Sequence, residues 1–369
     1  MAIKASGGNP PTNSLSFLEI ENEFGQNSTR SLGAYRMNNL NIGDLTEVSL
    51  SRDGCGINAN SDIPVDNEEI KFSDFFSAKQ NIIIDLHTSN QNRINAKNDK
   101  YNASSQSGNY IVVGSPSKPT TTNGKKVIIH VNKTIGSAAG NITNVALRTG
   151  NWDSGTEVLV EVGTNGIIAG AGGNGGNGRN SASGLPGGDG TSGLGIDYDG
   201  TNIQTTGGSI ICGFGGGGAG GGGETKREGN WRGSGRGPEV VVGGPGGGGG
   251  QGIPGGAGGT GSNGSPDGTA GSATAPGDGG EGISRTSRGE ATINAGDGGE
   301  GGGVVNNAVE NADDGTPSFL SGGEHENPHT TGGGGGGGNG AAIRKVSGIN
   351  FTLIGSPTTF GATDQIGVS

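Results

Sequence analysis

Hydrophobic and polar positions alternate most clearly in the first half of the chain, between residues 78 and 162. Five runs of β-branched and aliphatic residues occur there, separated by Asn, Ser, Gly and Pro. The runs are 81–86, 110–113, 126–131, 146–149 and 157–162. Short apolar runs bounded by turn residues are typical of β-strands. We therefore predict a β-rich domain over 78–162, folded either as a β-sandwich or as a short β-solenoid.

An amphipathic pattern comes before these strands. Apolar residues at 17, 18, 20 and 24 follow serines at 14 and 16, which predicts one helix that starts at a serine cap. Aromatic residues are frequent in the same region, 1–77. They are Phe17, Phe24, Tyr35, Phe72, Phe75 and Phe76. We interpret 1–77 as a small attachment module whose aromatic residues form either a docking surface or the module's own core.

Glycine replaces the hydrophobic pattern from residue 163 onward. The chain has 86 glycines, and most lie between 163 and 340 in runs such as 215–218 and 332–338. These runs have no side chains to bury and lose much backbone entropy on ordering. Polyproline-II-like strands direct their N–H and C=O groups outward with three residues per turn, so neighbouring strands can satisfy them. We therefore predict a polyglycine-II helix bundle over 163–369.

A flexible linker and a collagen-like triple helix are the alternatives for these runs. Collagen needs glycine at every third position, a period that is not kept here, and the chain has only 14 prolines. A linker does not need the segments of other composition that separate the runs. These segments are 196–211, 224–242, 283–295 and 304–331. We interpret them as loops that join long glycine strands, with short strands at 209–211, 239–242 and 349–354.

Charge and cysteine content narrow the classes of partner. The formal net charge is −11, and no cluster of Lys or Arg could hold a phosphate backbone, so we expect no nucleic acid. Residues 1–8 lack the apolar core of a signal peptide, and no apolar stretch is long enough to cross a membrane. We expect no membrane insertion, and release by lysis as part of a virus particle. Cys55 and Cys212 form a disulfide or are buried small residues.

Several motifs resemble those of tailed-phage proteins. Segments 16–25, 31–35 and 70–76 resemble a module near the start of many phage tail and fibre proteins. Segments 165–176 and 338–343 are similar to the glycine-rich motifs of T-even-like tail-fibre tip adhesins. The resemblance implies a polyglycine-II sandwich whose variable loops contact a bacterial receptor. The β-rich region is an addition to a minimal tip adhesin of this kind.

Receptor recognition needs aromatic and polar side chains held on rigid turns, because ordering a mobile loop on binding costs affinity. The segments between the glycine runs provide such residues. The candidates are Asp197, Tyr198, Asp199, Arg227, Trp231, Arg232, Phe319, His325 and His329. For each aromatic residue, packing within its own loop is the alternative role.

No metal, cofactor or catalytic residue is expected. Segment 197–202 contains carboxylates like those of a Ca²⁺ loop but lacks the rest of that loop. His325 and His329 are four residues apart, yet Pro328 opposes the helix that would bring them together. Matches to Gly-x-Gly-x-x-Gly have no strand–turn–helix context, and no nucleophile motif occurs. A carboxylate pair, as in a depolymerase, stays open as an alternative.

These observations favour a non-enzymatic phage adhesin with three parts: 1–77 for attachment, 78–162 as a β-rich spacer, and 163–369 for recognition. Its expected partners are tail or tail-fibre proteins and a bacterial surface protein or glycan, with a homotrimer as the oligomer considered. Its expected location is the virion, after synthesis in the host cytoplasm. The alternatives are a structural virion protein that recognises nothing, and an ice-binding protein, whose regular face the unequal inserts oppose.

Overall fold

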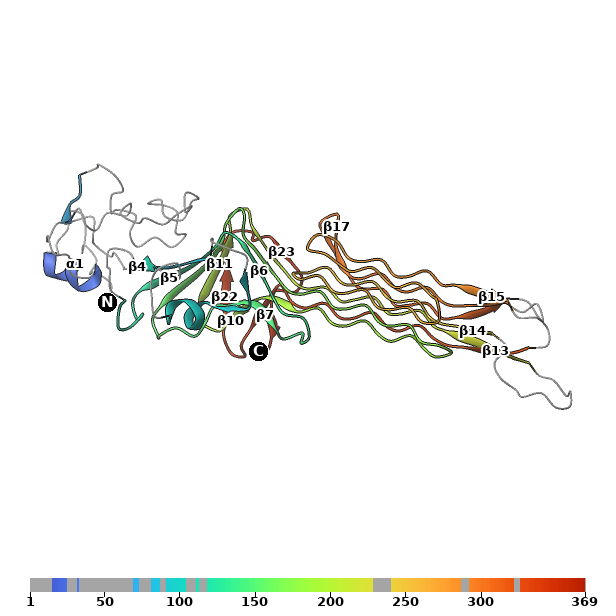
Figure 1. Ribbon diagram of the computed structural model, residues 1–369. Coiled ribbons are helices and arrows are strands. Elements are labelled where there is room, and N and C mark those ends of the chain that lie inside the picture. Colours follow the sequence, from blue (N-terminus) through green and yellow to red (C-terminus); the bar gives the residue numbers. More distant parts are fainter. Residues whose placement is uncertain are drawn as a thin grey trace.

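The structure of the chain is a computed structural model that describes most residues after 80 and short parts before it (Figure 1). The described residues are 15–24, 32, 69–72, 81–86, 91–103, 111–112, 118–227, 240–286, 292–321 and 326–368. They form mainly β-strands with few helices, which confirms the predicted mainly β fold.

Helix α1 (Phe17–Phe24) confirms the helix predicted near the start of the chain. It begins after Ser16, whose hydroxyl accepts a hydrogen bond from the Glu19 N–H at 3.3 Å. The Glu19 carboxylate in turn accepts one from the Ser16 N–H at 2.8 Å. This reciprocal capping satisfies two N–H groups that a helix start otherwise leaves without partners.

Three sheets built largely of parallel strands form the middle of the molecule. The first contains β1 (Asn81–Leu86), β5 (Lys126–Val131), β8 (Glu157–Val162), β11 (Thr201–Thr205) and β22 (Phe351–Leu353). The second contains β2 (Gln91–Asn92), β6 (Thr134–Gly136), β9 (Ile167–Ala169), β12 (Ser209–Ile211) and β23 (Thr359–Phe360). The third contains β3 (Ile94–Asn95), β7 (Val145–Arg148), β10 (Ser192–Ile196), β21 (Ile343–Lys345) and β24 (Gln365–Ile366).

Successive strands of these sheets along the chain belong to the first, second and third sheets in turn, and each set of three strands forms one coil of a stack. We call the whole the coil stack and number its coils in chain order. Coil 1 is β1–β2–β3, coil 2 is β5–β6–β7, coil 3 is β8–β9–β10, coil 4 is β11–β12–β21, and coil 5 is β22–β23–β24. Strand β4 (Ile111–Val112) pairs antiparallel with β1 outside coil 1. A π-helix, η3 (Ala96–Tyr101), follows coil 1.

Aligned aliphatic side chains explain why the coils stack. Ile84, Ile129, Val160 and Ile203 occupy the same register position in β1, β5, β8 and β11, and all are fully buried. A second column, Ile94, Leu147, Leu194 and Ile343, runs through the third sheet. These columns belong to the main hydrophobic core. Burying one such side chain stabilises the fold by about 1.5–3 kcal/mol.

The strand runs expected between 78 and 162 are present as β1, β4, β5, β7 and β8. The sheets also continue well beyond residue 162, through coils 4 and 5 to residue 366. The expected boundary at 162/163 therefore falls inside the coil stack. Segment 196–211, expected as a loop with a short strand at 209–211, contains β11 as an additional strand, and β12 confirms the strand predicted at 209–211. The glycine-rich segments leave the stack after β9 and after β12, and return to the third sheet each time.

Ten extended glycine-rich segments within the described residues form a bundle beside the coil stack. We number them tracts 1–10 in chain order. They are 170–178, 184–191, 213–222, 243–251, 254–262, 265–272, 275–282, 295–302, 311–318 and 331–340. Successive tracts run in opposite directions, away from the coil stack and back to it (Figure 1).

Hydrogen bonds between tracts recur at every third residue. For example, the N–H groups of Gly247 and Gly250 donate to the carbonyls of Gly176 and Gly173, each at 2.9 Å. Tract 3 bonds to tracts 1, 2, 4, 8, 9 and 10, and tract 4 bonds to tracts 1, 3, 5, 6, 7 and 8. The other eight tracts form a ring around these two. Main-chain hydrogen bonds, instead of apolar side chains, therefore hold the bundle together.

Close backbone contacts require glycine inside the bundle. A Cβ atom on Gly218 would overlap the carbonyl oxygen of Gly334 on the adjacent tract. At outward positions, side-chain oxygens accept N–H groups of the neighbouring tract. Asn174 Oδ1 accepts from the Ala257 N–H at 3.0 Å, and Asn177 Oδ1 accepts from the Thr260 N–H at 2.8 Å. The polar residues of the tracts thus complete the hydrogen bonding at the bundle surface.

Cys212 lies where coil 4 leads into tract 3. Its thiol is free and fully buried, and burial raises the pKa of this thiol to about 12. This side chain acts as a small buried group, one of the two roles expected from the sequence. Cys55 lies outside the described residues.

Candidate functional site

Outside the coil stack, most of the residues that join one glycine tract to the next belong to the end of the bundle opposite the coil stack (Figure 1). Odd-numbered tracts run toward this end and even-numbered tracts run back, so the connections from each odd tract to the next even tract lie here. We call it the distal end. The three longest of these connections are 223–242, 283–294 and 319–330.

Two small antiparallel sheets close the distal end. In the first, β13 (Gly223–Arg227) lies between β14 (Val240–Val242) and β20 (Glu326–Thr330). In the second, β16 (Thr292–Asn294) lies between β15 (Ser284–Thr286) and β19 (Phe319–Ser321). Strand β14 confirms the strand predicted over 239–242. Each sheet combines strands that belong to different connections, so the connections support one another.

A small apolar core joins these two sheets. Val242 and Ile293 are fully buried, Ala295 is nearly so, and Val240 packs against them. Arg285 adds polar links at the surface, because its guanidinium donates to the carbonyl of Asn263 at 2.8 Å and to that of Val241 at 3.2 Å. The distal end is therefore built on fixed strands.

Some of the predicted recognition residues lie at this end. Phe319 is in β19 with 58% of its surface exposed, and His329 is in β20 and is exposed as well. Arg227 is the last residue of β13, in the same sheet as His329. Trp231, Arg232 and His325 lie outside the described residues. The structure thus brings Arg227, Phe319 and His329 to one end of the molecule.

Asp197, Tyr198 and Asp199 lie elsewhere, on the coil stack. The Asp197 side chain is 5% exposed and accepts three hydrogen bonds from the Arg148 guanidinium, the shortest at 2.6 Å. These bonds raise the pKa of Arg148. The Tyr198 hydroxyl donates to the carbonyl of Asp153 at 2.9 Å, and Asp199 accepts from the Asn350 N–H at 2.7 Å. All three side chains tie neighbouring segments of the coil stack together.

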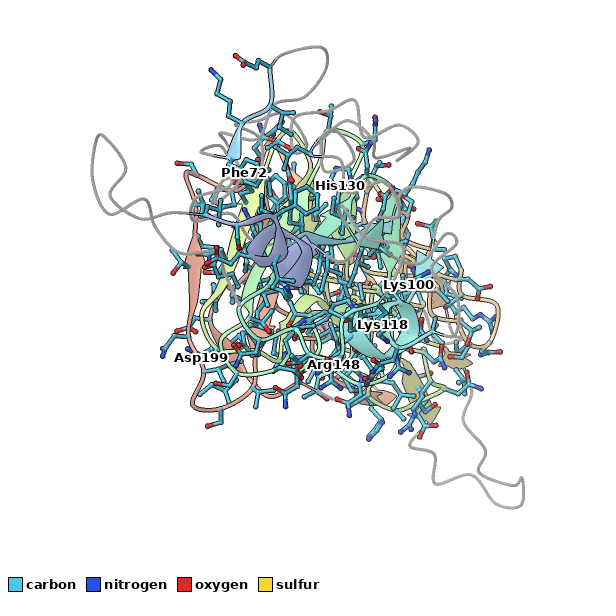
Figure 2. All side chains as sticks on the ribbon, turned by 90° about the vertical axis from the view of Figure 1, so that its left-hand side faces the viewer. Phe72, Lys100, Lys118, His130, Arg148 and Asp199 are labelled. Atoms are coloured by element: carbon cyan, nitrogen blue, oxygen red, sulfur yellow. The ribbon has the colours of Figure 1, made fainter. Side chains whose placement is uncertain are left out.

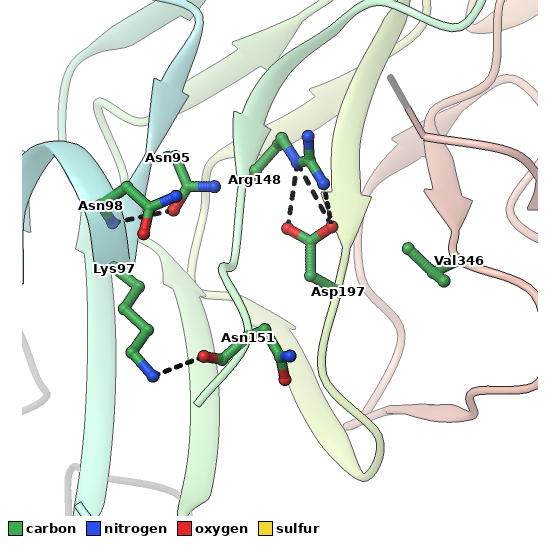
Figure 3. Close-up of a pocket in the computed structure, with 7 residues that line it drawn as sticks. All are labelled: Asn95, Lys97, Asn98, Arg148, Asn151, Asp197 and Val346. Atoms are coloured by element: carbon green, nitrogen blue, oxygen red, sulfur yellow. Dashed lines mark hydrogen bonds and ion pairs between the residues drawn. The ribbon is translucent and has the colours of Figure 1, made fainter. Parts of the chain in front are cut away.

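A hollow of about 420 Å³ lies beside this ion pair, between η3 and the third sheet (Figure 3). Its lining consists of Asn95, Lys97, Asn98, Arg148, Asn151, Asp197 and Val346. Both cations have partners here, because Lys97 Nζ donates to the Asn151 carbonyl at 2.5 Å and Arg148 pairs with Asp197. The remaining surface is mostly uncharged amide groups, which suit hydroxyl or amide ligands better than strong anions.

The aromatic residues assigned to attachment are described in part. Phe17 and Phe72 form an edge-to-face pair with ring centroids 6.2 Å apart, and Phe72 is 41% exposed. Ile20, on the same helix as Phe17, is fully buried. These contacts show that the two aromatic rings pack within the chain. The Phe24 side chain and Tyr35, Phe75 and Phe76 lie outside the described residues.

One buried polar row was missed by the sequence analysis. Asp85, His130, Glu161 and Gln204 occupy the same register position in β1, β5, β8 and β11, and all are buried. His130 Nδ1 lies 3.3 Å from Asp85 Oδ1. Aligning the runs 81–86, 126–131 and 157–162 places Asp, His and Glu at the fifth position of each, which was the available signal.

Neither a metal-binding cluster nor a membrane-spanning helix occurs among the described residues. No group of three or more His, Cys, Asp or Glu side chains among them is arranged to hold a metal ion. Across the same residues, no helix has the length and apolar character needed to span a bilayer.

Comparison with known proteins identified no relative of this chain. No protein-family model, no curated protein and no solved structure matches this chain.

Proposed function

We propose that the coil stack is a short β-solenoid and that the tracts form a polyglycine-II bundle. Two observations support the second assignment: hydrogen bonds that recur at every third residue, and six neighbours for each of the two central tracts. A strand with three residues per turn directs its N–H and C=O groups in three directions each, which accommodates six neighbours. In this organisation the bundle is an insertion in coils 3 and 4 of the solenoid.

We propose further that the protein is a non-enzymatic adhesin of a phage tail or tail fibre. The observation that carries this proposal is that the described strands of the three longest connections, 223–242, 283–294 and 319–330, all lie at the distal end. The resemblance of 165–176 and 338–343 to tip-adhesin motifs agrees with it. The distal end would contact a bacterial surface protein or glycan, and the region before the coil stack would attach to the virion.

The physical advantage of this arrangement is low entropic cost on binding. Long loops lose conformational freedom when they bind, and each immobilised side chain costs about 0.5–1.5 kcal/mol. Here the connections start and end on strands of two sheets that share a buried core. Exposed Phe319 and His329 are therefore presented from a support that is already ordered. We assign no receptor contact to Asp197, Tyr198 and Asp199, whose side chains hold the coil stack.

The test is binding of the purified full chain to a panel of intact bacterial cells. We expect saturable binding to at least one strain, and binding at least about tenfold weaker for the double variant Phe319→Ala/His329→Ala. The matched control is Val309→Ala, an exposed apolar residue (44%) on a hairpin away from the distal end. Circular dichroism checks that all variants are folded.

Each other outcome of this test has a definite meaning. Unchanged binding by the folded double variant would remove Phe319 and His329 from the recognition surface. No binding to any strain by the wild-type chain would favour the second candidate, a structural virion protein that recognises nothing. Binding to ice in place of cells would favour the remaining alternative from the sequence, an ice-binding protein.

A further inference from the structure

Coil 5 leaves the apolar core of the coil stack open at one end. Leu353 continues the column of Ile84, Ile129, Val160 and Ile203, which are fully buried. Leu353 itself is 38% exposed because no further coil covers it in the described part of the chain. Ile366, on the third side of the same coil, is 61% exposed. One core position, that of Leu353, and the apolar side chain of Ile366 are therefore exposed to solvent at this end.

The same end presents strand edges on all three sides. Strands β22, β23 and β24 are the last members of the first, second and third sheets, and no described strand pairs with their outer edges. Figure 2, a view along the long axis of the bundle, shows the C-terminal strands on one flank, where Asp199 is labelled, and Lys100 and Lys118 away from it. The open end thus faces sideways and the bundle does not cover it.

This end lacks the charges that normally protect exposed strand edges. Natural proteins block such edges with charged residues, with proline or with covering elements. Between residues 351 and 368 the only charged residue is Asp364, and it pairs with Lys345 at 2.8 Å. Solenoid ends are usually closed by polar capping units, which are needed for solubility. The open end, whose one charged residue between 351 and 368 is neutralised by an ion pair, is therefore suited to contact with another protein surface.

A second copy of this chain fits the end best. The chain as a whole carries a net charge of −11, and the bundle surface contributes to it at exposed positions of tracts 7, 8 and 9. These positions are Asp278, Glu281, Asp297, Glu300, Asp313 and Asp314. Two copies that meet through any such surface repel each other. The coil 5 end exposes Leu353 and Ile366, and Asp364 is the one charged residue between 351 and 368, so that repulsion is small there.

The arrangement of the two copies follows from the opposite end of the coil stack. Stacking coil 5 of one copy on coil 1 of another would need the outer edge of β1, which β4 already occupies. A two-fold axis avoids this obstacle because it brings coil 5 against coil 5. Such an axis reverses the strand direction, so edge strands meet antiparallel, an arrangement in which unpaired N–H and C=O groups can bond.

We propose that the protein forms a two-fold symmetric dimer through coil 5, in which Leu353 and Ile366 are covered and the edges of the three sheets pair across the interface. Because each edge strand is only two or three residues long, the three edges act together, and the dimer forms in a concentration-dependent manner. This inference is independent of the proposed receptor binding, and it replaces the homotrimer considered from the sequence.

The experiment is sedimentation equilibrium of the full chain over about a hundredfold range of concentration. We expect a monomer–dimer equilibrium for the wild-type chain. Thr352→Lys and Ile366→Lys change exposed side chains on two different edges and place a charge at each, so each variant should weaken dimerisation at least tenfold without loss of fold. Val309→Lys, on an exposed hairpin elsewhere, is the matched control and should dimerise as the wild type does.

Hydrogen exchange provides a second measurement that does not depend on variants. Backbone N–H groups of β22 and β24 should exchange more slowly at high protein concentration than at low concentration, while those of β13 should not change. A wild-type chain that is monomeric at all concentrations, or trimeric, would overturn the proposal. So would a dimer that both lysine variants leave unaffected, because its interface would then lie elsewhere.

Discussion

At the scale of single residues, position within a tract decides whether glycine is required. Gly334 is buried, and a Cβ there would overlap the carbonyl oxygen of Leu185. Gly335, its neighbour in sequence, is exposed, and a Cβ there would have its nearest contact at 3.6 Å from Asp314. The sequence shows seven consecutive glycines at 332–338 and does not distinguish them. Their difference arises from which face of the tract meets a neighbour.

This difference gives a direct test of the bundle. Gly334→Ala should lower the free energy of unfolding by roughly 1–3 kcal/mol or more, because tracts must separate to admit the methyl group. Gly335→Ala should leave stability unchanged or raise it slightly, since the substitution restricts the unfolded chain. Thermal unfolding of the two variants, followed by circular dichroism, makes the comparison. Equal melting temperatures would contradict the close packing of tracts 2 and 10.

Asp153 gives the coil stack a pH dependence at the same scale. The N–H of Thr122 and the hydroxyl of Thr121 both donate to its carboxylate at 2.8 Å, and with Lys97 nearby they hold its pKa below the ordinary value of 3.8. A lowered carboxylate pKa stabilises the fold at pH values above the ordinary pKa, and this contribution is lost as pH falls through the lowered value.

We therefore expect the stability of the wild-type chain to decrease as pH falls below about 4. Asp153→Asn should be less stable at neutral pH, and the difference from wild type should shrink in acid. Urea unfolding at several pH values, with Asp278→Asn as the control at an exposed carboxylate, measures this effect. A constant difference between wild type and Asp153→Asn across pH would contradict the assignment.

At the scale of elements, local pattern and non-local pairing contribute differently. The runs 81–86, 126–131 and 157–162 predict β1, β5 and β8 because their apolar residues are continuous and their turn residues are clear. Strand β10 has the sequence Ser-Gly-Leu-Gly-Ile, which contains two glycines and has no strand pattern of its own. It is a strand because β7 and β21 pair with it on either side. Such context is not visible in a local stretch of sequence.

For the candidate site residues too, the local sequence predicts some positions and non-local packing decides others. The association of aromatic and charged residues with the segments between tracts predicts that Phe319 and His329 are exposed. The same reasoning predicts Tyr198 as a recognition residue on a loop. It does lie on the turn between β10 and β11, but its hydroxyl bonds to Asp153 and its ring packs against the main core. Tyr198 is 45 positions from Asp153 in sequence, so this role depends on how the coils stack.

The distal sheets provide a prediction for one element pair. Ile293→Ala removes a central side chain of their small core, and large-to-small changes of this type cost about 2–5 kcal/mol in well-packed cores. We expect faster hydrogen exchange in β13 and β16 and little change in β5 and β8, because the coil stack has a separate core. Val309→Ala is the control. Equal acceleration in both regions would show that the two parts unfold as one unit.

At the scale of the whole molecule, two kinds of stabilisation are joined in one chain. Apolar burial is concentrated in the coil stack, whereas hydrogen bonds between main chains hold the bundle. When a protein unfolds, exposure of apolar surface to water raises the heat capacity, and exposure of polar surface lowers it. A chain with so large a share of buried main chain should therefore show an unusually small change in heat capacity.

Calorimetry tests this expectation. We expect a heat-capacity change on unfolding clearly below the usual 12–15 cal/mol/K per residue. The change can be obtained from the variation of unfolding enthalpy with melting temperature as pH is varied. A value within the usual range would mean that the bundle buries much more apolar surface than its sequence provides.

The double insertion of the bundle into the coil stack also has a consequence for the order of events during synthesis. Tract 2 bonds to tract 10, and the Gly338 N–H donates to Asp189, 149 positions earlier in the chain. In tract 3, the Gly215 N–H donates to the side chain of Asn339, which lies 124 positions later in the chain. Folds dominated by such distant contacts form slowly. The early tracts therefore leave the ribosome long before their last partners exist, and the ring closes only when tract 10 has been made.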